Sequence, residues 1–113
     1  MKWQITYYNE TVQEEVSALP DTLLARYICL TELMIEHGPN LGMPHTKAMG
    51  DSLFELRLKG KEGIARVFYC TIVGHKILML HAIIKKQQET SLKRLRLAKQ
   101  RLKEVKHHGK KNT

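Results

Sequence analysis

Apolar and polar residues alternate along three stretches in the second half of the chain, at 53–59, 63–72 and 76–85. A period of two is typical of β-strands with one buried face, and short connections such as "VGHK" predict antiparallel neighbours. A shorter segment rich in aromatic and β-branched residues, at 3–8, predicts a further strand near the N-terminus. The chain is therefore expected to form a sheet.

Helical patterns lie between the strand expected at 3–8 and the three strands expected at 53–85. Asn9 or Thr11 can cap a short helix, and Asp21 is placed to cap a second helix that continues to about residue 36. Apolar residues at intervals of three and four positions mark the buried side of the second helix. The stretch 38–51 holds three glycines and two prolines with little periodicity, which predicts a surface loop.

A last helix is expected after Thr90 or Ser91, either of which can provide its N-cap. Its apolar seam is formed by Leu95, Ala98, Leu102 and Val105. The segment 107–113, "HHGKKNT", is predicted to be a basic disordered tail, so that a single domain spans residues 1–106. The order β-α-α-β-β-β-α predicts an α+β fold with one mainly antiparallel sheet and helices packed on one face.

Composition narrows the class of protein. A chain of 113 residues can form one hydrophobic core. No apolar run approaches the length of a membrane span, and "MKWQITYYNE" contains no hydrophobic signal core, so we expect a cytoplasmic protein without a membrane partner. Cys29 and Cys70 lie in apolar surroundings, which is typical of buried, reduced thiols.

Charge is divided unevenly along the chain, whose formal net charge is +8. Residues 1–56 hold three Lys or Arg against eight Asp or Glu, whereas residues 57–113 hold sixteen against three. The second half is therefore expected to attract a polyanion, either a phosphate backbone or an acidic protein partner.

Strand alternation places the cations of this half on one side of the sheet. If Leu56 and Leu58 face the core, Arg57 and Lys59 face the other way together with Glu55. The last strand is expected to turn Leu78, Leu80, Ala82 and Ile84 to the core. The opposite face then displays Arg57, Lys59, Arg66, His81 and Lys85. Only Glu55 can neutralise them from that face.

Two interpretations of this face remain open. Cations on strands are usually solvated, and a lone histidine is more often a hydrogen-bonded core residue than a catalyst. The basic last helix also has the composition of an ordinary exposed helix, although it holds few acids. The shared orientation of five positions on three strands favours a bound anion, because cations that share one face repel each other.

The stretch "KAMGDSLFELRLKGKEGIARVFYC", followed by "ILMLHAIIKKQQET" and a basic helix, resembles the phage-derived HigB-like branch of the RelE/ParE toxin superfamily. The resemblance covers nearly the whole chain. It implies a RelE-like fold and a toxin of a type II toxin–antitoxin pair. RelE-like and HigB-like members are ribosome-dependent endonucleases that cut mRNA, whereas ParE members inhibit DNA gyrase. In HigB-like pairs the antitoxin is usually a helix-turn-helix protein.

The resemblance also implies which residues are catalytic. The RNA-cleaving relatives use cations on the concave sheet face and near the C-terminal helix, and the matching catalytic positions here are Arg57, Lys59, Arg66, His81 and Lys85. Lys86 is a looser match. Several relatives place a tyrosine near the end of the last helix, where this chain has Val105. Tyr69 is not a substitute, because its alternation places it in the core.

Such residues suit metal-independent cleavage, in which a 2′-hydroxyl attacks the adjacent phosphate. Arg57 and Arg66 suit phosphate binding, and Lys59, His81 and Lys85 are candidates for proton transfer. A metal cofactor is not expected, because Glu55 is the only carboxylate on the face and no Cys/His spacing matches a zinc site. No phosphate-binding glycine loop is present.

The last helix is expected to add sequence-independent attraction to mRNA and rRNA. Its candidate RNA-binding residues, with Lys86 before it, are Lys93, Arg94, Arg96, Lys99, Arg101 and Lys103. The expected partners are the ribosome, mRNA and a cognate antitoxin. Two alternatives stay open: a gyrase inhibitor with the same fold, and a non-catalytic RNA-binding domain.

Overall fold

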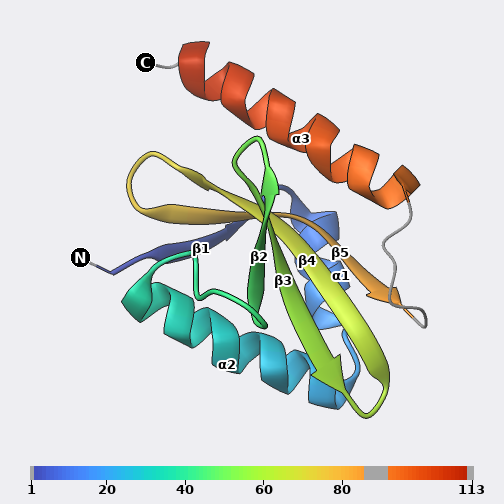
Figure 1. Ribbon diagram of the computed structural model, residues 1–113. Helices are drawn as coiled ribbons and strands as arrows, with labels where there is room; N and C mark the ends of the chain where they lie inside the picture. Colours follow the sequence, from blue (N-terminus) through green and yellow to red (C-terminus); the bar gives the residue numbers. More distant parts are fainter. Residues whose placement is uncertain (1, 86–91, 112–113) are drawn as a thin grey trace.

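The computed structural model describes residues 2–85 and 92–111 and contains a single sheet with three helices (Figure 1). The elements in chain order are β1 (Gln4–Tyr7), α1 (Glu10–Ser17), α2 (Asp21–His37), β2 (Thr46–Gly50), β3 (Leu53–Gly60), β4 (Gly63–Ile72), β5 (Lys76–Lys85) and α3 (Leu92–Lys111).

The five strands lie in the order β1-β5-β4-β3-β2. Strands β2 to β5 form an antiparallel meander, and β1 adds to it in parallel along the first part of β5. The predicted α+β class and the three predicted C-terminal strands are therefore confirmed. Tight turns join β3 to β4 and β4 to β5. These turns fix which residues lie opposite each other in the two hairpins.

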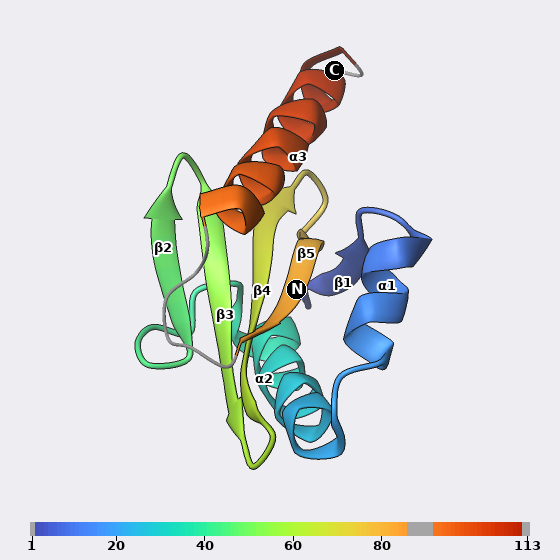
Figure 2. The same ribbon diagram turned by 90° about the vertical axis from the view of Figure 1, so that its right-hand side faces the viewer.

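The helices cover both faces of the sheet. Helices α1 and α2 pack on one face, in a core that includes Val12, Leu23 and Met34. Helix α3 crosses the other face over Phe68 and Leu80, as Figures 1 and 2 show. The expectation that the helices share one face therefore holds for α1 and α2 and is corrected for α3. The physical reason is that β4 and β5 are apolar at nearly every position, so that both of their faces need cover.

Strand β2 lies within the stretch 38–51 that was predicted to be a loop. It pairs with β3, and Lys47 lies directly opposite Glu55. The buried Thr46 fixes its start, because the Thr46 hydroxyl donates to Asn40 Oδ1 (3.3 Å) and accepts from the Gly42 amide (2.8 Å). The prediction failed because pairing with a strong neighbour, rather than its own hydrophobic pattern, holds this edge strand in place.

A β-bulge in β5 changes the predicted alternation. Phe68 pairs with His81 and Tyr69 with Met79, so that the register skips Leu80. Ile77 and Met79 therefore join Ala82 in the core under α1 and α2, and Leu78 and Leu80 lie under α3. The predicted core positions Leu78 and Leu80 are thus corrected, as is Ile84, which is half exposed. One extra residue in a strand exchanges the two faces for all side chains on one side of it. The residues just before His81 are all apolar, so the sequence does not show where this exchange occurs.

The sequence predicted some of the helix ends correctly. Asn9 caps α1 through its side chain, which accepts from the Val12 amide (2.9 Å), and Gly38 ends α2 with a positive φ of 101°. Asp21 is the first residue of α2 rather than its cap, which is Pro20. The predicted caps of α3, Thr90 and Ser91, lie outside the described residues.

Helix α3 runs to Lys111, beyond the residue 106 at which the domain was predicted to end. No helix in the described ranges is long and apolar enough to cross a membrane. Cys70 is buried, and burial raises the pKa of its thiol to about 11. Cys29 is exposed on α2, which corrects the expectation that both thiols are buried.

Candidate active site

The strand register brings the predicted cations to one face of the sheet. Arg57 lies directly opposite Arg66, which lies opposite Ile83 on β5. His81 lies opposite Phe68, which packs under α3. These pairs place the guanidinium groups and the imidazole on the face that α3 crosses, because directly opposite residues of an antiparallel pair point to the same side.

At the centre of this face, Glu55 forms ion pairs with both arginines. Its Oε1 atom lies 3.0 Å from Arg66 Nη1 and 3.7 Å from Arg57 Nε. The side chains of Glu55 and Arg66 are only 2% and 9% exposed, whereas that of Arg57 is 29% exposed. The two arginines are therefore neutralised in part by one carboxylate, and the accessible part of the cluster is cationic.

The cluster belongs to a hairpin that continues past the N-terminal end of α3. Figure 2 shows the β3–β4 hairpin extending well below the start of the helix. Lys59 is exposed near the hairpin tip and pairs with Ile64, which in turn pairs with Lys85. The side chain of Lys85 and the whole of Lys86 lie outside what the structure describes.

His81 is buried and is kept neutral by its surroundings. Its side chain is 3% exposed, and its Nε2 atom lies 3.4 Å from Arg94 Nη1 on α3. Its Nδ1 atom lies 3.8 Å from Glu15 Oε1 on α1. Burial, together with the positive charges of Arg101 and Arg94, lowers the pKa of His81 to about 4. This placement contradicts the expectation that His81 transfers protons at neutral pH.

The buried imidazole should make stability depend on pH. The folded pKa of about 4 lies below the ordinary value of 6.5, so the stabilisation is complete above pH 6.5 and is lost as the pH falls toward 4. We expect this loss to reach at most about 3 kcal/mol in the free energy of unfolding. Urea denaturation at several pH values across this range should show that the free energy of unfolding of the wild type falls as the pH is lowered. The free energy of unfolding of His81→Gln should fall less.

The exposed His37 on α2 provides the control for this experiment. The variant His37→Gln should keep the wild-type dependence of unfolding free energy on pH. An unchanged slope in His81→Gln would show that the imidazole is not the titrating group.

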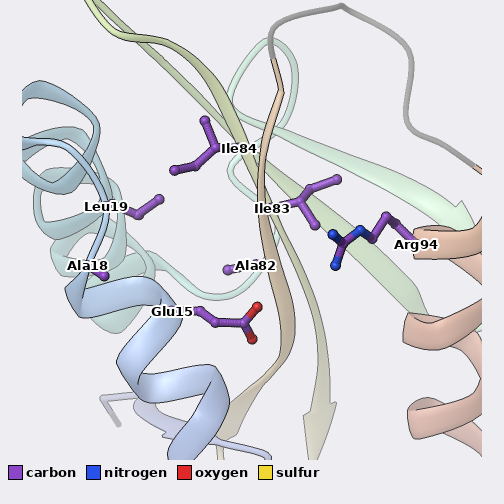
Figure 3. Close-up of a pocket in the computed structure, with 7 residues that line it drawn as sticks. All are labelled: Glu15, Ala18, Leu19, Ala82, Ile83, Ile84 and Arg94. Carbon is purple, nitrogen blue, oxygen red and sulfur yellow. The ribbon is translucent and has the colours of Figure 1, made fainter.

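A cavity of about 330 Å³ lies beside His81, between α1 and α3 at the edge of β5 (Figure 3). It begins beyond Met79, where the pairing of β5 with β1 ends. Its wall is formed by Glu15, Ala18, Leu19, Ala82, Ile83, Ile84 and Arg94. The wall is mostly apolar and includes neither Arg57 nor Arg66, so this cavity is separate from the arginine cluster.

Strand β2 adds Lys47 to the face, and the turn before β2 brings the backbone of His45 next to Arg57. Lys47 is exposed and lies opposite Glu55, and the carbonyl of His45 accepts from the Arg57 amide (2.8 Å). His45 is half-buried and lies in the turn that precedes β2. Neither residue lies in a hydrophobic pattern that would have revealed its position.

The cations of α3 divide into two groups. Lys93, Arg96, Lys99 and Lys103 are exposed along the helix. Arg101, in contrast, donates to the carbonyl of Leu80 (2.6 Å) and lies 4.9 Å from the ring centre of Tyr8. Tyr8 also donates a hydrogen bond to Glu104. Arg101 and Arg94 therefore contact the sheet through Leu80 and His81, and the RNA-binding role expected for them stays a prediction.

Tyrosine chemistry is not supported at this face. Tyr69 is fully buried in the core on the opposite side, as predicted, and its hydroxyl donates to the Pro39 carbonyl (2.5 Å). Burial raises the pKa of Tyr69 above its ordinary value. Val105 packs against the core under α3.

Comparison with known proteins decides the family. Residues 14–103 match the model of the family described as "Phage derived protein Gp49-like (DUF891)". The chain belongs to this Gp49-like family. Among curated proteins, none matches the sequence.

The fold of this Gp49-like protein is similar to that of a solved toxin structure. The free Escherichia coli toxin RelE, in a form with two arginine-to-alanine mutations, superposes with a TM-score of 0.65 at 13% sequence identity. The superposition covers 89% of this chain and 98% of that chain. The family match and the RelE-like fold agree with the sequence resemblance: the chain is a Gp49-like protein, and the predicted RelE-like fold is confirmed.

Proposed function

We propose that this protein is the toxin of a type II toxin–antitoxin pair and cleaves mRNA on the ribosome without a metal ion. The observation that carries the proposal is the cluster of Arg57 and Arg66 around Glu55, on the sheet face that α3 crosses, from which Arg57 reaches solvent. The RelE-like fold and the exposed cations of α3 support it. A HigB-like helix-turn-helix antitoxin would keep the toxin inactive in the cytoplasm.

In the proposed reaction, the arginines stabilise the charge that develops on the phosphate. Arg57 and Arg66 donate hydrogen bonds to the non-bridging oxygens while the 2′-hydroxyl attacks phosphorus. A base takes the 2′-hydroxyl proton and an acid protonates the departing 5′-oxygen, which leaves a cyclic 2′,3′-phosphate and a 5′-hydroxyl.

The groups available for proton transfer are Lys59, Lys85 and His45. A deprotonated lysine amine can accept the 2′-hydroxyl proton as a base. His45 lies next to Arg57, whose amide donates to the His45 carbonyl (2.8 Å). The buried, neutral His81 instead serves to pack α3 against β5.

Expression in a bacterial host distinguishes this function from gyrase inhibition. An induced endoribonuclease should stop growth and fragment mRNA while the chromosome stays intact. Intact mRNA with accumulating DNA breaks would contradict the proposal in favour of gyrase inhibition. Growth arrest that persists on co-expression with an adjacent helix-turn-helix gene would refute the antitoxin pairing.

The exposed lysines of α3 should set the salt dependence of RNA binding. If Lys99 and Lys103 each contact a phosphate, the double variant Lys99→Ala/Lys103→Ala should lower the slope of log K against log salt by about 1.4. Titration of single-stranded RNA at several KCl concentrations measures this slope. The variant Lys2→Ala, in the acidic half of the chain, should keep the wild-type slope, and a wild-type slope in the double variant would exclude α3 from the interface.

A further inference from the structure

Arg57 and Arg66 occupy a pairing that is unfavourable by itself. They lie directly opposite each other on β3 and β4, and like charges in that position repel. Repulsion between the two guanidinium groups favours rotamers that move them apart. A group that holds them together is therefore required if both are to reach one ligand.

Glu55 has the position and the burial to be that group. It precedes Arg57 by two residues on the same face, and one of its oxygens contacts Arg66 Nη1 at 3.0 Å and Arg57 Nε at 3.7 Å. The carboxylate is almost completely buried, whereas Arg57 reaches solvent. The anion thus lies behind the accessible cation.

We propose that Glu55 is a positioning residue, whose carboxylate holds the two guanidinium groups side by side so that both bind one phosphodiester. The inference rests on the proposed function, since it names how that site is organised. A guanidinium carries five N–H donors, so contact at Arg57 Nε leaves its Nη groups directed to a ligand. Side chains ordered before binding lose less entropy when the phosphate arrives.

This role has a consequence opposite to that of simple electrostatics. Removal of a negative charge near an anion site strengthens anion binding when charge alone matters. If the carboxylate orders the arginines, its removal weakens binding although the net charge becomes more positive. The sign of the change in affinity therefore separates the two roles.

The test uses the full chain and a single-stranded 2′-O-methyl RNA oligonucleotide, which lacks the attacking hydroxyl. Fluorescence anisotropy should show binding to Glu55→Gln that is about tenfold weaker than binding to the wild type. The matched control is Asp51→Asn, which makes the same charge change in the exposed β2–β3 turn at a positive φ that asparagine tolerates. Asp51→Asn should bind as well as the wild type or slightly better. Equal or tighter binding by Glu55→Gln would overturn the inference.

A second variant covers the case in which Glu55→Gln does not fold. Glu55→Asp keeps the charge but withdraws the carboxylate by one methylene, so positioning predicts weaker RNA binding at unchanged net charge. Affinity equal to that of the wild type would show that Glu55 only balances charge. Cleavage by the wild type on translating ribosomes is measured separately: its absence refutes the endonuclease proposal, while the binding comparison still decides the role of Glu55.

Discussion

Replacing Arg66 with alanine is expected to lower the free energy of unfolding by about 3–5 kcal/mol, because it leaves a buried carboxylate without its nearer partner. Glu55 is 1% exposed, and Arg57 is the more distant of its two cations, at 3.7 Å. Urea denaturation monitored by circular dichroism measures the change.

The control removes both charges of the buried pair. The double variant Glu55→Gln/Arg66→Met keeps similar side-chain volumes and removes both charges of this pair, so its free energy of unfolding should lie much closer to that of the wild type. A loss below about 1 kcal/mol in Arg66→Ala would show that the ion pair is not desolvated as the structure indicates.

Replacing Arg57 with alanine should separate activity from stability. This side chain is 29% exposed and is the more distant partner of Glu55, so its loss should cost less stability than the loss of Arg66, whereas loss of one donor to the developing phosphate charge should lower the cleavage rate about 100-fold. The measurement is mRNA cleavage by purified variants on translating ribosomes at saturating protein. Lys61→Ala, an exposed change in the turn of the same hairpin, should cleave like the wild type. Full activity in Arg57→Ala would remove the arginine cluster from the proposed site.

Much of the sheet could be predicted because apolar and polar residues alternate along its strands. In β3, the residues Leu56 and Leu58 alternate with Arg57 and Lys59, which fixes both the strand and the side on which the cations lie. The seam of α3 was also visible, because Ala98 and Leu102 fall at helical spacing and lie buried on the sheet. In each of these elements, local preference and tertiary packing agree.

Other features depend on interactions that no local pattern reveals. The bulge at Leu80 lies in a run of apolar residues, where a shift of one position exchanges one apolar residue for another. Strand β2 exists because β3 offers it a partner. The burial of His81 follows from the packing of α3 across the second face, and that packing changes the expected chemistry of the imidazole.

The candidate site was predicted in its location and incompletely in its composition. Strand alternation placed Arg57 and Arg66 on the same face, but it did not show that Glu55 contacts both of them. It also assigned Lys47 to a loop, whereas β2 brings this residue opposite Glu55 on the same face. Distances between side chains on different strands depend on rotamers and burial, which alternation alone does not determine.

The most direct test of the central claim is primer-extension mapping of a defined mRNA incubated with the purified protein, with and without active translation. The account predicts new 5′ ends within the translated region when ribosomes are translating, with no divalent metal required beyond what the ribosome itself needs. It also predicts that these ends disappear when initiation is blocked and when Arg57→Ala replaces the wild type. An mRNA that stays intact on translating ribosomes would contradict the account.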